Sequence, residues 1–154
     1  MYWFRSGLGL AAAIGLTAIA PPPTASAADA TKPVAARQAT MKQVALAMKT
    51  AAPFTSAKTP FEPLTVKRLM GNVATSARKL HSLYPRSSAT DVNTAADPQI
   101  WQKWDDFEKR LTEMERLATL AGKANTMTDF KPAFSTLGAT CKSCHDVYRK
   151  KKTT

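Results

Sequence analysis

The sequence predicts an all-α protein, an antiparallel four-helix bundle, and three observations lead to that prediction. Four stretches repeat apolar or small residues at intervals of three and four, the spacing of one face of an α-helix. Proline-rich or polar segments of about 5–15 residues separate them, which suits antiparallel neighbours. No stretch sustains the alternation of apolar and polar residues that a half-buried strand requires. The chain has 154 residues, 44% of them hydrophobic, which is enough for one packed domain.

The first 27 residues are expected to be removed before the protein folds. Arg5 precedes a short apolar stretch, residues 7–20, and Pro21–Pro23 ends it. Ala25-Ser26-Ala27 then supplies the small residues of a secretory cleavage site. A membrane anchor is the alternative, but the apolar stretch is shorter than the roughly 20 residues that span a bilayer. We expect export to the periplasm through a cleaved signal peptide, with residues 28–154 as the mature domain and no membrane span in it.

The first two helices are expected on either side of a loop that contains three prolines. A short flexible lead at 28–33 should precede the first helix, which ends before Pro53. The second helix should end before Pro85, and a polar loop at 86–97 should follow it. The apolar face of the first helix consists of Val34, Met41, Ala45, Met48 and Ala52, and that of the second of Val66, Leu69, Val73, Ala77, Leu80 and Tyr84.

The third and fourth helices have recognisable start signals. Asp97 is a suitable N-cap with Pro98 at the first helical position. Thr128 or Asp129 is expected to cap the last helix. The apolar face of the third helix consists of Ile100, Trp104, Phe107, Leu111, Met114, Ala118 and Ala121, and that of the fourth of Phe130, Phe134, Leu137, Cys141, Cys144 and Tyr148.

The fourth helix carries the motif with the clearest chemistry. Cys141-Lys142-Ser143-Cys144-His145 matches the C-x-x-C-H pattern of covalent c-type haem attachment. Residues at i, i+3 and i+4 share one face of a helix, so both thiols can reach the vinyl groups of one porphyrin. The imidazole of His145 is then placed to be the proximal ligand of the haem iron.

The two cysteines have three other possible interpretations. A redox-active C-x-x-C pair normally belongs to a βαβ pattern, which this sequence does not show. A structural disulfide within one helical turn would be strained. A zinc site would need further ligands, and His81 is the only other histidine. Covalent haem is therefore the favoured interpretation.

The mature chain resembles the class II c-type cytochromes, that is, cytochrome c prime and its low-spin, Met-ligated relatives. Three stretches carry the resemblance: residues 37–42, residues 98–107, and residues 137–149 around the haem motif. The position of that motif near the C-terminal end is what selects this class. The resemblance implies an exported four-helix bundle with one covalent haem c per chain.

The resemblance also implies roles for individual residues. Met41 matches the first-helix position that faces the distal side of the haem, which would make it the second ligand of the iron. Arg37 matches a partner of a haem propionate, since a guanidinium can bind a carboxylate with two hydrogen bonds. Arg149 matches an arginine near the proximal side, and Trp101 an aromatic near the haem.

Each of these residues also has a simpler interpretation. Met41 could be a core residue, in which case Met48 or His81 would be the next candidate ligand. Arg37 could be an exposed arginine, and Trp101 a packing residue.

The charge pattern bears on partners. The chain has 22 Lys and Arg against 11 Asp and Glu, a net charge of +11. Residues 32–52 contain four basic and no acidic residues, and Arg149-Lys150-Lys151-Lys152 follows the last helix. These features indicate either a solvated basic surface or steering towards an acidic redox partner. Nucleic acid is not expected for an exported protein, and the resemblance leaves open a homodimer.

Two functions follow from the ligand set, and neither is enzymatic. With Met41 bound, the protein would be a one-electron carrier with a low-spin, His/Met-ligated haem. With the distal position open, it would instead be a five-coordinate cytochrome c prime that binds nitric oxide or carbon monoxide. Thiol–disulfide exchange would require both cysteines to be free. No catalytic acid, base or nucleophile is evident in the sequence.

Overall fold

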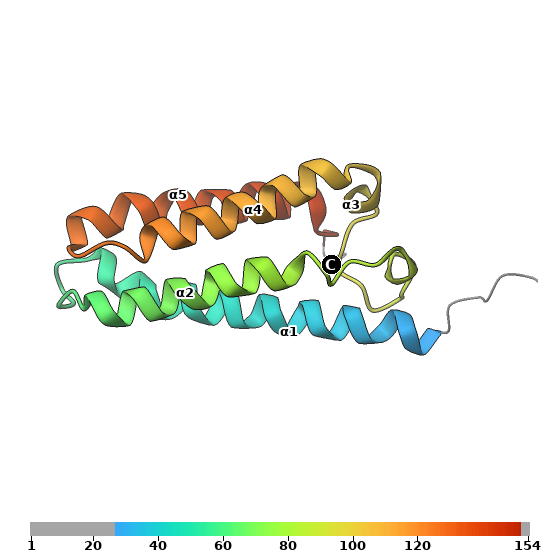
Figure 1. The fold of residues 1–154 in the computed structure, drawn as a ribbon, viewed down its shortest axis with the longest axis horizontal. Coiled ribbons are helices and arrows are strands. Elements are labelled where there is room, and N and C mark those ends of the chain that lie inside the picture. Colours follow the sequence, from blue (N-terminus) through green and yellow to red (C-terminus); the bar gives the residue numbers. More distant parts are fainter. Residues whose placement is uncertain (1–26, 152–154) are drawn as a thin grey trace, which may run out of the picture.

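Four long helices run antiparallel along a common axis in the computed structural model, which describes residues 27–151 (Figure 1). They are α1 (Ala27–Ala51), α2 (Pro63–Leu80), α4 (Trp104–Ala121) and α5 (Met127–Tyr148). The short elements are the 3₁₀ turns η1 (Ala52–Thr55) and η2 (Arg86–Ser88) and the one-turn helix α3 (Gln99–Gln102). The predicted fold class is confirmed.

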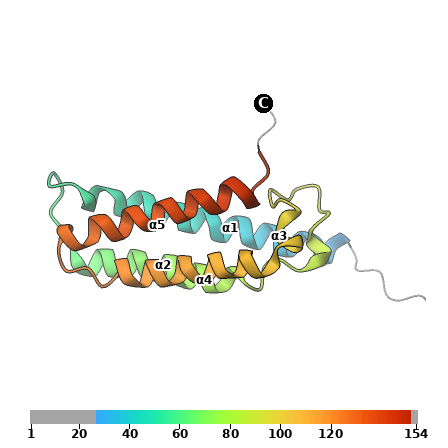
Figure 2. The same cartoon turned by 90° about the horizontal axis from the view of Figure 1, so that it is seen from above.

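The four helices occupy the corners of a square when the two views are combined (Figures 1 and 2). Direct packing joins α1 to α2, α2 to α4, and α4 to α5. Helices α1 and α5 form the remaining edge, opposite α2 and α4. Within residues 27–151, no helix is both long and apolar enough to cross a membrane. Residues 1–26 of the predicted signal peptide and Lys152 of the basic run lie outside the described residues.

Two element boundaries differ from the predicted ones. Helix α1 begins at Ala27 and contains Pro33, so the flexible lead predicted at 28–33 was wrong. A single proline removes only one backbone hydrogen bond, and the alanines around it favour a helix. The predicted third helix is divided into α3 and α4, because the backbone of Lys103 leaves the helical region (φ −121°, ψ 47°).

The structure shows a capping hydrogen bond at Asp97, as predicted, but a different cap for α5. Asp97 accepts a hydrogen bond from the backbone N–H of Gln99 (2.9 Å), as its predicted capping role requires. The cap of α5 is Thr126 rather than Thr128 or Asp129: its hydroxyl accepts from Asp129 N (3.2 Å) and donates to the Asp129 carboxylate (2.7 Å). The cap thus lies two residues before Thr128 and three before Asp129, and the Asp129 carboxylate binds the capping hydroxyl in return.

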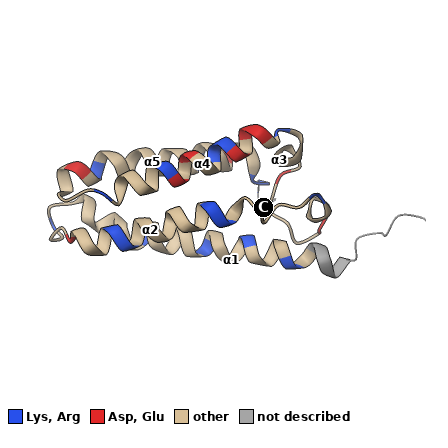
Figure 3. Cartoon of the chain, viewed as in Figure 1, with Lys and Arg blue, Asp and Glu red and all other residues tan. Residues whose placement is uncertain are grey.

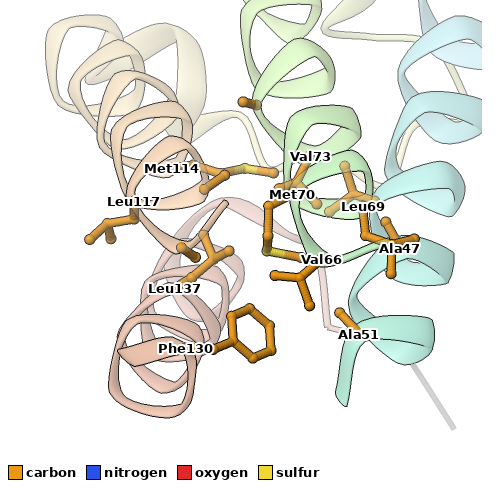
Figure 4. Packing of buried hydrophobic residues seen from close by; sticks show 14 of the residues in the cluster. Ala47, Ala51, Val66, Leu69, Met70, Val73, Met114, Leu117, Phe130 and Leu137 are labelled. Carbon is orange, nitrogen blue, oxygen red and sulfur yellow. The ribbon is translucent and has the colours of Figure 1, made fainter. Parts of the chain in front are cut away.

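Two clusters of buried side chains fill opposite halves of the bundle. The first surrounds Met70 and Phe130, where α2 packs against α4 and α5 (Figure 4). The second is rich in aromatic rings and lies towards α3, where Tyr84, Phe107 and Tyr148 meet at centroid distances of 4.7 and 5.3 Å.

The buried face of α1 is not the predicted one. Of the predicted members, only Val34 is buried, while Met41 and Met48 are half-buried and Ala45 and Ala52 are exposed. The reason is that α1 has two faces with apolar or small residues. The face turned to α2 is buried, whereas the predicted face is not. The residues of the buried face are Val34, Arg37, Thr40, Val44, Ala47 and Ala51.

The cap of α5 provides a first test. Thr126→Ala removes the hydroxyl that satisfies Asp129 N, and we expect it to lower the free energy of unfolding by about 1 kcal/mol. The matched control is Thr128→Ala, an exposed position two residues later, with an expected change within about 0.5 kcal/mol. Denaturant midpoints of the haem-loaded protein give both values, and equal midpoints for the two variants would contradict the assignment.

Candidate haem site

A cavity of about 560 Å³ lies between α1 and α5. Its volume is in the range of sites that hold organic cofactors. Its walls are largely apolar and come from α1, α4, α5 and residues 84–100, with α1 and α5 facing each other across it. The principal wall residues are Met41, Ala45 and Met48 from α1, Phe107, Leu111 and Met114 from α4, and Gly138, Cys141, Cys144 and His145 from α5.

The three residues of the attachment motif line this cavity together. Cys141, Cys144 and His145 are all half-buried on α5, as their spacing on one helical face predicts. Cys141 and Cys144 are not joined by a disulfide. Among the described residues, no three His, Cys, Asp or Glu side chains form a group that could hold a metal ion.

The electrostatic environment of the two cysteines disfavours thiol exchange. Burial raises the pKa of the Cys141 thiol, and burial also raises the pKa of Cys144, to about 11. Redox-active C-x-x-C pairs depend instead on a lowered thiol pKa, so thiol–disulfide exchange is disfavoured. Burial, and to a lesser degree the charge of Arg149, lower the pKa of His145. The neutral imidazole, the form that binds metals, is therefore favoured.

Met41 belongs to the wall opposite the attachment motif. It is half-buried on α1 and packs against the aromatic cluster at the α3 end. Met48 lines the cavity two turns further along α1 and packs against the other cluster. His81 lies outside the cavity at the end of α2, with its Nδ1 3.6 Å from the Glu108 carboxylate. Two methionines of α1 thus face α5, and His81 is not placed to join them.

Arg37 lines the cavity but is only 3% exposed, so it is not the exposed arginine of the simpler interpretation. Its guanidinium donates to the hydroxyl of Ser88 (2.8 Å), to the Leu83 carbonyl (3.2 Å) and to the hydroxyl of Thr94. The same group lies 4.8 Å from the ring centroid of Tyr84. The guanidinium of Arg37 is therefore hydrogen-bonded to oxygen atoms of the protein itself.

The resemblance also predicted that Trp101 and Arg149 lie near the haem. Trp101 is buried and donates from Nε1 to the Tyr84 carbonyl (3.0 Å), and it does not line the cavity, so it is a packing residue. Arg149 lines the cavity beside His145.

Sequence analysis missed a polar cluster beside the cavity. Asp106 accepts from Arg110 (2.7 Å) and from the Tyr148 hydroxyl (2.5 Å). Both bonds lower the pKa of Asp106, with the bond from Tyr148 contributing most. Arg110 lines the cavity beside Phe107 and Leu111, and its i,i+4 spacing from Asp106 was the available signal.

The residues present fit a covalent haem. Two thiols and an imidazole share one wall, the opposite wall offers a thioether, and the space between is apolar with guanidinium groups at its rim. This donor set matches haem, whose iron is held by His and Met side chains in many cytochromes c. When bound, the haem supplies one-electron redox chemistry, while the protein supplies ligands, dry walls and positive charge.

The fold and this donor set define a c-type cytochrome of four-helix-bundle architecture. Comparison with known proteins agrees, because a family model described as cytochrome c′ matches residues 32–149. The chain belongs to the cytochrome c′ family and carries one covalently bound haem c.

Individual relatives support this assignment. Cytochrome c-556 of Agrobacterium tumefaciens (strain B2A) is 32% identical over 75% of this chain and 95% of its own. Cytochrome c′ of Rhodopseudomonas palustris is 32% identical over 77% of this chain and 82% of its own. A solved structure of cytochrome c′ from Rhodopseudomonas palustris superposes with a TM-score of 0.73 at 31% identity, covering 79% of this chain and 98% of that one.

The attachment residues can be tested by removing the thiols. Cys141→Ala and Cys144→Ala should each leave at most one thioether, and the double variant should carry no covalent haem. Because the cavity is then unfilled, the double variant should unfold at a lower temperature. Intact mass and a pyridine haemochrome assay check the first expectation, and thermal unfolding the second. A double variant that keeps covalent haem, or that folds as stably without haem, would contradict this site.

Proposed function

We propose that this protein is a periplasmic one-electron carrier whose haem iron is ligated by His145 and Met41. The observation that carries the proposal is the placement of Met41 on α1 in the wall that faces His145 on α5. A thioether paired with an imidazole raises the reduction potential relative to other axial pairs. Both ligands come from helices, which helps to keep the coordination unchanged between oxidation states.

The relatives do not choose between the two predicted functions, since some are named cytochrome c-556 and others cytochrome c′. The choice rests on this chain's own residue at position 41. If Met41 stayed away from the iron, the distal side would be open to nitric oxide or carbon monoxide. Replacement of Met41 separates the two functions.

The proposal includes export and the absence of a catalytic role. The family match begins at residue 32, shortly after the predicted cleavage site at residue 27, which is what a cleaved signal peptide would leave. The cavity is lined mainly by apolar side chains and the proposed ligands, Arg37 and Arg110 there are hydrogen-bonded to neighbouring side chains, and we assign none of the lining residues to catalysis.

We also propose that an acidic redox partner docks over the α1–α5 edge. Basic residues are spread along α1 and α2, whereas most acidic residues cluster on α4 and near α3 (Figure 3). Helix α4, which carries five acidic residues together with Lys109, Arg110 and Arg116, is diagonal to α1. Lys42 and Arg149 are exposed at the cavity rim. A negatively charged partner would therefore be steered towards the side on which the haem lies.

Replacement of Met41 tests the proposed ligation. Met41→Leu keeps a similar volume and should cost less than about 1.5 kcal/mol in packing. We expect the ferric spectrum to change from low spin to five-coordinate high spin, the reduction potential to fall, and carbon monoxide to bind the ferrous form faster. Optical and electron paramagnetic resonance spectra, redox titration and stopped-flow mixing measure these changes.

Met48→Leu is the matched control, because Met48 lies on the same face of α1 and also lines the cavity. It should leave spin state and potential unchanged. If Met41→Leu leaves the spectrum unchanged, the carrier function through Met41 is wrong, and the gas-binding function replaces it. If Met48→Leu alone produces the high-spin form, the carrier function stands with the other methionine as ligand.

A further inference from the structure

Helices α1 and α5 face each other across the cavity, and besides their packing through α2 and α4 they are connected by contacts at its two ends. At one end the contact is apolar. The turn η1, which continues α1, packs against α5. Aromatic rings complete this contact, with centroids 6.3 Å apart for Phe54 and Phe61 and 5.8 Å apart for Phe61 and Phe130.

At the other end the link is polar and runs through residues 83–97, here called the connecting segment. Arg37 on α1 is its anchor. The hydroxyl of Thr94 accepts from Arg37 and also from the backbone N–H of Ala96 (3.1 Å). The other acceptors for Arg37 are the carbonyl oxygens of Leu83 (3.2 Å) and Ser88 (3.4 Å) and the hydroxyl of Ser88 (2.8 Å).

The connecting segment is also bonded to the end of α5. Asp97 N donates to the Tyr148 carbonyl (2.9 Å), and Lys150 N donates to the Ala95 carbonyl (2.9 Å). These two bonds flank the isolated bridge between Ala96 and Arg149. Hydrogen bonds at both ends of residues 94–97, together with the backbone between them, therefore connect α1 to the end of α5.

The buried guanidinium of Arg37 requires hydrogen-bond acceptors in closely defined positions. Its hydrogen-bond acceptors are neutral oxygens, and it lies 4.8 Å from the Tyr84 ring centroid and 5.9 Å from that of Trp101. A buried cation is tolerated only where donors and acceptors match closely, and a planar guanidinium holds several acceptors in one fixed geometry. The position of the connecting segment relative to α1 is therefore narrowly defined.

We propose that Arg37 and Thr94 are positioning residues that, through the connecting segment, fix the separation of α1 and α5 across the haem cavity. Met41 lies one helical turn after Arg37. The separation of α1 and α5 therefore sets how closely the Met41 sulfur approaches the wall that contains His145. The part of the inference that concerns Met41 rests on the proposed ligation. The part that concerns the width of the cavity does not.

Two matched pairs of variants test each end of the series in the haem-loaded protein. Thr94→Val removes the shared acceptor, while Thr94→Ser keeps the hydroxyl. Lys150→Pro removes the N–H that bonds Ala95, while Lys150→Ala keeps it and removes only the charge. Arg149 has an extended backbone (φ −114°, ψ 127°), which is the conformation that a residue before proline adopts.

Two measurements are made on each variant. The first is the high-spin fraction of the ferric protein with Met41 present. The second is the rate at which carbon monoxide binds the ferrous protein in the Met41→Leu background, where the distal side is open whatever the native ligand. Thr94→Val and Lys150→Pro should each change the ligation equilibrium and the binding rate by about fivefold or more, because each loses a hydrogen bond that holds the connecting segment in place. Thr94→Ser and Lys150→Ala should stay near their parents.

The two measurements separate this inference from the proposed function. If Met41 is not a ligand, the spin state is insensitive, but the carbon monoxide rate still responds to the variants and supports the positioning role. The inference is overturned if Thr94→Val and Lys150→Pro lower the unfolding temperature yet leave the carbon monoxide rate equal to that of the matched controls. Such a result would make the connecting segment a contributor to stability alone.

Discussion

The packing of this protein depends on the edge of the bundle between α1 and α5. Three helix pairs are in direct contact, whereas α1 and α5 lie on either side of a largely apolar cavity, where Met41, Met48, Cys141 and Cys144 are half-buried. Apolar surface left in contact with water costs free energy in proportion to its area. Haem attached at Cys141 and Cys144 would cover this surface. The same group that carries the chemistry therefore also completes the core.

This constraint accounts for the two-faced character of α1. One face packs on α2 through Val44, Ala47 and Ala51, and the next face presents Met41 and Met48 to the cavity. It also accounts for the different contacts at the two ends of the cavity. Aromatic rings close the end next to η1, and the Arg37 hydrogen bonds close the end next to η2. Polar contacts at the second end specify geometry more narrowly than apolar packing does, and that end lies beside the proposed iron ligands.

Much of the fold and the attachment site could be predicted from sequence because both follow local rules. Helical periodicity defined four helices, and the C-x-x-C-H spacing placed Cys141, Cys144 and His145 on one face. The remainder depended on tertiary contacts. Periodicity could not distinguish the packed face of α1 from its cavity face, since both are apolar or small. Nor could it show that Arg37 reaches residues 46 to 57 positions away, because those partners are brought near only by the turn between α2 and α3.

The central claim is that α1 supplies Met41 to the iron held by His145. The most direct measurement is the electron paramagnetic resonance and optical spectrum of the unmodified ferric, haem-loaded protein. A low-spin signal together with the weak long-wavelength charge-transfer band of an iron–thioether bond is the predicted result. A high-spin, five-coordinate spectrum would contradict the claim, since it would place no sixth ligand on the iron.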